Sequence, residues 1–179
     1  MDKVLENLAN DYLLNADNSL WAAKKICEVV PENTVERMFK AEDPLYFLMG
    51  HAAELVLKAA LVYKEFDESS LKKNELRHDL NALLNKNKEN HIRIDNDFEV
   101  FVDAIAENFK DHDFRYARIF SGFPEEKHEE LLASIRGGKN KKELKKYGLA
   151  VKSKVNVEKS LQAIENQIQL IAKQKREAA

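Results

Sequence analysis

The chain has 179 residues and a formal net charge of −2 at pH 7, with 29 lysines and arginines against 31 aspartates and glutamates. A net charge this close to zero does not indicate a class of binding partner. The charges are unevenly distributed, however, with an acidic stretch at 89–113 and a basic stretch at 136–159. The single cysteine, Cys27, excludes a disulfide framework and a zinc site made of cysteines. Only five glycines and three prolines occur, so the composition favours helix along almost the whole chain.

The first helical pattern lies between residues 9 and 30, where apolar residues recur at steps of four and three. The polar run 17–19 is a candidate break in this stripe, with Ser19 as the cap of a second helix. Pro31 is expected to end the pattern. The N-terminal sequence MDKVLENLANDYLL is acidic and amphipathic, which does not fit a signal peptide.

The most apolar helix is predicted from Pro44 to Phe66, with Pro44 in its first turn. Three ionisable residues, His51, Glu54 and Lys58, interrupt the apolar sequence. A buried core helix is therefore expected in preference to a membrane span. Together with the N-terminus, this predicts a cytoplasmic protein with no membrane association.

Two further helices are predicted after a polar connection at 67–73. Leucines at 76, 80, 83 and 84 mark the first of them. The second is expected to begin at Asn96, since Glu99 follows three residues later in the manner of a capping box. Its apolar face would consist of Phe98, Phe101, Val102, Ile105 and Phe109.

The last third of the chain is expected to contain a surface strap at 111–123, a helix at 124–136 and a long final helix. Residues 139–146 hold a lysine cluster, which is either a solvated linker or a non-specific nucleic-acid contact. The seam of the final helix would pack on the domain or on a second copy. It consists of Val157, Leu161, Ile164, Ile168 and Ile171.

No segment alternates with the period of a strand, so the sequence predicts an all-α, up-and-down helical bundle with a long C-terminal helix. The bundle would span residues 1–135. Residues 136–179 would form a basic linker and a C-terminal helix that packs on the bundle or on a dimer partner.

The ionisable residues of the central helix share one stripe, because His51, Glu54 and Lys58 lie three and four positions apart, within about 60° of one another. Three hypotheses account for them. The first is a Glu54–Lys58 pair with His51 hydrogen-bonded nearby at a helix or dimer contact. The second is a pocket for an anionic ligand such as a nucleotide or RNA backbone, and the third is acid–base catalysis by His51. Phe47, one turn earlier, would wall one side of such a site. The ligand set is too small for a metal, and no cofactor motif occurs, so neither group is expected.

Two other groups of residues are candidates for a site. Asp79 is expected either to cap the helix that follows, with His78 in a local hydrogen bond, or to join His78 in a ligand site. Arg115 and Arg118 share a face if their segment is helical, and they lie among aromatic residues. They would grip phosphate and stack on bases, or else pair with the acidic residues just before them.

Three segments carry a family resemblance. The sequence GHAAELVLKAALV at 50–62, followed by LRHDLNALL at 76–84, resembles the core of HEPN-like domains. The segment DHDFRYARI at 111–119 is similar to an aromatic, arginine-containing stretch in some bacterial HEPN-like proteins. The resemblance covers about residues 21–120. It implies a helical bundle, usually dimeric, of a family that works in toxin–antitoxin, anti-phage and RNA-processing systems.

Active HEPN members are metal-independent ribonucleases with an R-x(4–6)-H motif, in which the histidine moves protons and the arginine stabilises phosphate charge. This chain departs from that pattern, because no arginine is followed by a histidine at the required spacing; Arg77 is adjacent to His78 instead. The sequence therefore predicts a homodimeric HEPN-like domain that binds RNA or a nucleotide, with an antitoxin or nucleotidyltransferase as a candidate partner. The alternatives are a non-catalytic protein-interaction module and a divergent ribonuclease that uses His51 or His78 with Arg115 or Arg118.

Overall fold

The structure is a computed structural model that describes residues 2–30, 42–73, 76–110 and 155–177. In these ranges it contains six helices and no strand, which confirms the all-α prediction. The helices are α1 (Lys3–Val29), α2 (Glu42–Val62), α3 (Glu68–Leu71), α4 (Leu80–Glu89), α5 (Asn96–Lys110) and α8 (Val157–Glu177). The predictions for 111–123 and 124–136 lie outside the described residues.

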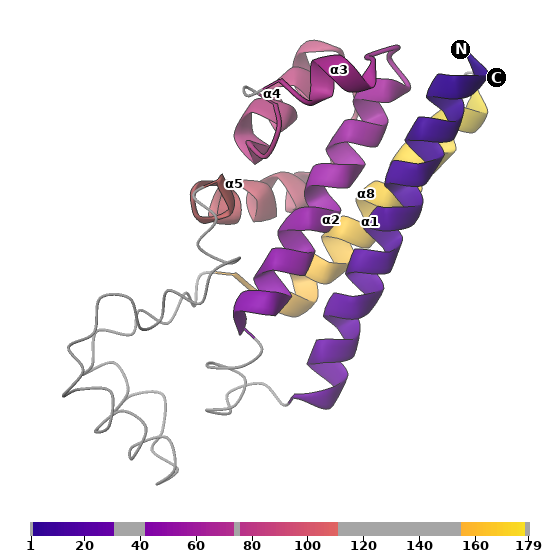
Figure 1. Cartoon of the computed structure of the whole chain (residues 1–179). Helices are drawn as coiled ribbons and strands as arrows, with labels where there is room; N and C mark the ends of the chain where they lie inside the picture. Colours follow the sequence, from indigo (N-terminus) through magenta and orange to yellow (C-terminus); the bar gives the residue numbers. More distant parts are fainter. Residues whose placement is uncertain (1, 31–41, 74–75, 111–154, 178–179) are drawn as a thin grey trace, which may run out of the picture.

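The helix α2 is the centre of the fold. Every residue from 52 to 62 is buried, because α1 and α8 lie along one side of α2 while α3, α4 and α5 gather on the other (Figure 1). The helix is long and apolar enough to cross a membrane over Pro44–Val62, with a mean hydropathy of 1.5. However, 83% of this apolar window is buried inside the bundle, so the protein core accounts for its composition.

The helix α1 runs antiparallel to both α2 and α8, and the start of α1 and the last turns of α8 meet at one end of the bundle (Figure 1). Alanines recur every seven residues on the inner face of α1, and all of them have 0% exposure: Ala9, Ala16 and Ala23. Such small side chains allow two helix backbones to approach closely. The Tyr63 hydroxyl, just past α2, donates to Asn10 Oδ1 of α1 at 3.2 Å.

The predicted break in α1 is wrong. The helix continues through residues 17–19, because Asp17 and Asn18 face solvent and the Ser19 hydroxyl donates back to the carbonyl of Asn15 at 2.9 Å. This i to i−4 bond satisfies a serine inside a helix without breaking it. The cap of α1 is Asp2, whose Oδ1 accepts from the amide of Val4.

The ends of α2 and α4 share one motif. The predicted helix Pro44–Phe66 stops earlier, at Val62, because Glu65 adopts a left-handed φ of 65°. The amide of Phe66 then donates to the carbonyl of Leu61. His91, with φ of 56°, ends α4 in the same way. Both are Schellman endings that carry a side chain where glycine is usual.

Two other expectations about helix starts need correction. The connection 67–73 contains a short helix, α3, that the polar sequence did not suggest; Asp67 caps it. The cap of α5 is Asp95 and not Asn96, because Asp95 Oδ1 accepts from the amides of Asp97 and Phe98. The predicted apolar face of α5 is confirmed, since all five of its residues are buried.

The final helix packs on the bundle itself. Leu161, Ile164 and Ile171 are buried in the common core, and Lys24 of α1 pairs with Glu165 of α8 at 3.0 Å. Gln167 of α8 is completely buried and holds the link before α5. Its Nε2 donates to the carbonyl of Arg93, and its Oε1 accepts from the amide of Asp95. One neutral side chain thus fixes the path of this link.

Candidate functional site

The ionisable stripe of α2 contains a buried ion pair. Lys58 Nζ lies 2.6 Å from Glu54 Oε1, and the two side chains are only 10% and 4% exposed. Lys58 also donates to the main-chain carbonyl of Arg77 at 2.8 Å. The predicted i, i+4 pair is therefore present, and the lysine extends it to the segment that precedes α4.

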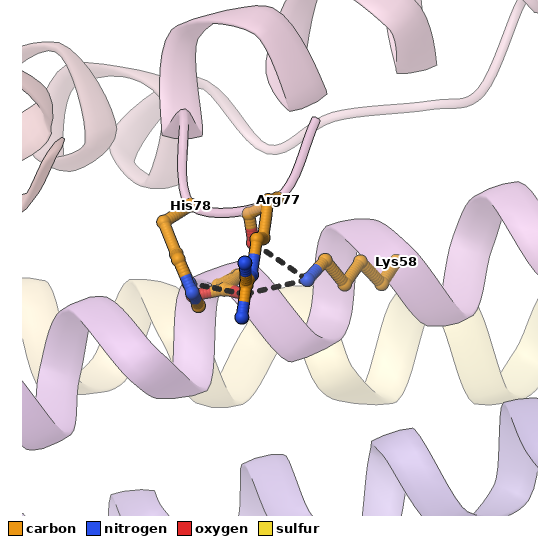
Figure 2. A network of polar contacts seen from close by, with 4 residues as sticks. Lys58, Arg77 and His78 are labelled. Carbon is orange, nitrogen blue, oxygen red and sulfur yellow. Dashed lines mark hydrogen bonds and ion pairs between the residues drawn. The ribbon is translucent and has the colours of Figure 1, made fainter. Parts of the chain in front are cut away.

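His78 completes this network from the other side. Its Nδ1 lies 3.2 Å from Glu54 Oε1 and 3.3 Å from Oε2. An ionised carboxylate only accepts hydrogen bonds, so Nδ1 carries the hydrogen in this contact. Figure 2 shows His78 pointing from the link towards α2, and Lys58 reaching along α2 to the backbone of Arg77. The imidazole is 29% exposed, so it lies at the edge of the network.

Next to His78, the backbone enters a helix. Asp79 Oδ1 accepts from the amide of Ala82 at 3.0 Å, which makes Asp79 the N-cap of α4. Arg77, on the other side of His78, is exposed. The link 77–79 is thus anchored twice, by its cap and by the charged pair of α2, and it presents an arginine and a histidine at the surface.

The buried ion pair has a desolvation cost that competes with the attraction between its charges. Removing a carboxylate and an ammonium from water costs several kcal/mol per ion, and their mutual attraction offsets this cost only when further hydrogen bonds complete the geometry. Here the Arg77 carbonyl and the His78 ring provide those bonds. A well-packed apolar pair would stabilise α2 at least as well. The polar network therefore gains its main significance from the segment that it positions.

His51 makes different contacts from the rest of the stripe. Its Nδ1 lies 3.0 Å from the Ser19 hydroxyl of α1. The same hydroxyl lies 2.9 Å from the carbonyl of Asn15, so Ser19 links the imidazole to the backbone of α1. Phe47 stacks on the imidazole with ring centroids 5.8 Å apart, as its position one turn earlier suggested, and Phe109 stacks on Phe47 in turn. These contacts hold the His51 ring between Ser19 of α1 and Phe47 of α2, and Phe47 itself packs on Phe109 of α5.

The Glu54 carboxylate also acts on Tyr12 of α1, a residue that the sequence pattern did not single out. Burial raises the pKa of Tyr12 on α1, and the negative charges of Glu68 and Glu54 raise it further. The hydroxyl therefore stays neutral over a wider pH range than a solvated tyrosine. This effect extends the influence of the Glu54 carboxylate to α1.

The structure thus brings together Glu54, Lys58 and His78 among the predicted site residues, and it adds the carbonyl of Arg77. Asp79 acts as a cap beside them, while His51 is linked to α1. Sequence reasoning missed the roles of Ser19 and Arg77, and a main-chain acceptor leaves no signal in side-chain chemistry. Arg115, Arg118 and the lysine cluster at 139–146 lie outside the described residues.

Within the described ranges, no three histidine, cysteine, aspartate or glutamate side chains gather closely enough to hold a metal ion. The side chains of the network offer hydrogen bonding, charge and proton transfer by imidazole. No family model, curated protein or solved structure matches the chain.

Proposed function

We propose that this chain is a HEPN-like domain that binds RNA or a nucleotide through the Arg77–His78 link. The observation that carries the proposal is the buried Glu54–Lys58 pair, which holds the backbone of an exposed arginine and the ring of a partly exposed histidine in place. Exposed donors that buried partners hold in place are a common arrangement at binding sites. The resemblance of 50–62 and 76–84 to HEPN cores coincides with the two segments that this network joins.

The chemistry of the link suits phosphate. A guanidinium recognises phosphate oxygens with two parallel hydrogen bonds, and an imidazole adds a further donor when protonated. Glu54 and Lys58 are buried and act on each other, so they are positioning residues in this proposal. His78 and Arg77 make the contact, and the salt dependence of binding should reflect only a few phosphates.

The test is fluorescence anisotropy with labelled single-stranded RNA at low salt. We expect Arg77→Gln to weaken binding by about ten- to hundredfold, since a lost hydrogen bond to a charged group is worth about 1.5–3 kcal/mol. Arg93→Gln is the matched control, because Arg93 is an exposed arginine in the link before α5. Equal affinities for wild type and Arg77→Gln, or no binding of any RNA or nucleotide, would refute the proposal.

The same RNAs also separate binding from catalysis. The Glu54 carboxylate fixes the hydrogen on Nδ1 of His78, which is the arrangement that a histidine needs to transfer protons through its other nitrogen. A divergent ribonuclease would cleave RNA in the presence of EDTA and lose cleavage in His78→Ala. Intact RNA across several sequences would leave the binding function alone. A neighbouring reading frame for a nucleotidyltransferase or antitoxin would place the chain in a toxin–antitoxin system.

A second candidate function is a non-catalytic, homodimeric interaction module. Large apolar side chains are exposed on one arc of α1, namely Val4, Leu14, Trp21 and Val29, with Trp21 62% exposed. Tryptophan dominates the binding energy of many interfaces. Sedimentation analysis should then show a dimer that Trp21→Ala dissociates and that Val100→Ala, at an equally exposed residue of α5, leaves intact. A wild-type monomer at high concentration would remove this candidate.

A further inference from the structure

An open groove of about 500 Å³ lies between the link before α5 and one face of α8. Arg93 and Asn96 belong to one wall, and Asn166, Gln169 and Lys173 belong to the other. The residues of α8 are spaced by three and four, so they form one row along the helix, about 10 Å long. Volumes of this size accommodate ligands well above the size of a simple ion.

The groove has a fixed wall. The completely buried Gln167 binds the carbonyl of Arg93 and the amide of Asp95 at 3.1 Å and 2.8 Å. The link therefore cannot shift independently of α8. A wall held before a ligand arrives lowers the ordering cost of binding.

The charge of the groove is positive. Arg93 is exposed, and no carboxylate in the described part of the chain forms an ion pair with it. Lys173 is exposed on the opposite wall. The single acidic residue of the lining, Asp95, has its carboxylate directed at the amides of Asp97 and Phe98 as the cap of α5. The groove thus offers the Arg93 guanidinium to an anionic ligand, with little repulsion from Asp95.

We propose that this groove binds an acidic peptide segment of a partner protein in an extended conformation. Asn96 and Gln169 each carry both a donor and an acceptor, which is the complement of a peptide group; Asn166 adds the N–H donors of its Nδ2, since its Oδ1 already accepts from Gln162 Nε2 at 3.0 Å. The exposed Arg93 guanidinium complements a carboxylate side chain. A row of about 10 Å matches about three residues of extended chain. The lining contains no aromatic ring, so it lacks the stacking platforms on which single-stranded nucleic acids rest.

The experiment uses the full chain and a short fluorescein-labelled peptide of alternating glutamate and serine, with a glutamine–serine peptide as its neutral counterpart. Anisotropy at low salt measures affinity, and NMR of the side-chain amides of Asn166 and Gln169 locates the site. We expect Arg93→Gln to weaken binding of the acidic peptide about tenfold. Arg77→Gln and Lys64→Gln, which replace exposed cations outside the groove, should leave it unchanged.

Each result is decisive. Loss of peptide binding in Arg93→Gln but not in Arg77→Gln, with amide shifts at Asn166 and Gln169, supports the groove. Equal binding of the neutral peptide, no binding of the acidic one, or an unchanged affinity in Arg93→Gln overturns it. Loss of RNA binding in Arg93→Gln with peptide binding intact would also overturn it, in favour of nucleic acid. The RNA assay with Arg77→Gln is a separate measurement, so failure of the groove proposal and failure of the proposed function can be distinguished.

Discussion

The links that precede α4 and α5 are each held to a long helix by a buried side chain, but the two side chains differ in chemistry. Each contains an arginine two residues before an aspartate that caps the next helix: Arg77 and Asp79 in one, Arg93 and Asp95 in the other. In each, a buried side chain of a long helix donates to the arginine's main-chain carbonyl. Lys58 of α2 does so in the first link, and Gln167 of α8 does so in the second.

The difference lies in charge. The amide of Gln167 satisfies its own polar groups with two backbone contacts and needs no third partner. Lys58 requires Glu54, and Glu54 in turn accepts from His78. We call the Gln167 contacts the neutral clamp and the Glu54–Lys58 pair with its contacts the charged clamp. Removing the neutral clamp costs only the free energy of its hydrogen bonds. Removing one partner of the charged clamp leaves an uncompensated ion inside the bundle. The comparison therefore predicts unequal sensitivity to substitution.

The largest effect is expected for Lys58→Met. This change leaves the Glu54 carboxylate buried without its ammonium, which should lower the free energy of unfolding by about 3–5 kcal/mol. Urea denaturation followed by circular dichroism measures it. The double variant Glu54→Gln/Lys58→Met should recover most of the loss, since no charge is then stranded. Equal stabilities of the single and double variants would show that charge is not the reason.

A smaller effect is expected for Gln167→Met. The substitution keeps the length of the side chain but removes its contacts with Arg93 and Asp95, so about 1–3 kcal/mol should be lost. The same denaturation assay applies, with exposed Gln169→Met as the matched control on α8. A loss as large as that of Lys58→Met would contradict the distinction between charged and neutral clamps.

The two capping aspartates should differ less. Replacing either by alanine should cost about 1 kcal/mol. Asp95→Ala should be the more damaging of the two, because Asp95 Oδ1 accepts from two amides of the first turn of its helix. Asp103→Ala, in an exposed interior position of α5, controls for the loss of a carboxylate. A reversed order would mean that the clamps, and not the caps, determine the stability of the links.

The smallest effect concerns alkaline pH and tests the reach of the Glu54 charge. The pKa of Tyr12 is raised by burial and by Glu68 and Glu54. A raised folded-state pKa contributes stability below about pH 10, and this contribution disappears as pH rises further. Wild type should therefore lose stability relative to Tyr12→Phe above pH 10. In Glu54→Gln, absorbance titration should show the phenol ionising at lower pH, and an unchanged titration would mean that the two groups do not interact.

Sequence periodicity was sufficient to find the apolar faces of α1, α5 and α8, because those faces follow from local spacing alone. It failed at Ser19, where a polar run suggested a break. The run's first two residues face solvent, and its serine finds a partner on another helix. The cap of α5 was misplaced by one residue because Asp95 and Asn96 are both good caps, and geometry alone decides between them.

The contacts of the site also fall into those that the sequence predicts and those that it does not. The Glu54–Lys58 pair was foreseeable, since its partners lie one turn apart. The contacts of His78 with Glu54, and of Gln167 with the link before α5, join residues far apart in the sequence. They depend on how the helices cross, which a single sequence does not reveal. The groove beside α8 was missed for the same reason, as its two walls come from distant segments.

The alanines on the inner face of α1 have a consequence for His51. Serine carries its hydroxyl only one carbon from the backbone, and yet Ser19 reaches the imidazole of the neighbouring helix. This reach requires the two helix axes to lie close, and Ala16 and Ala23, on either side of Ser19, leave nothing that would hold them apart. A bulkier residue at either alanine would push the two helices apart, and His51 would lose its hydrogen bond to Ser19 although its own surroundings on α2 were untouched.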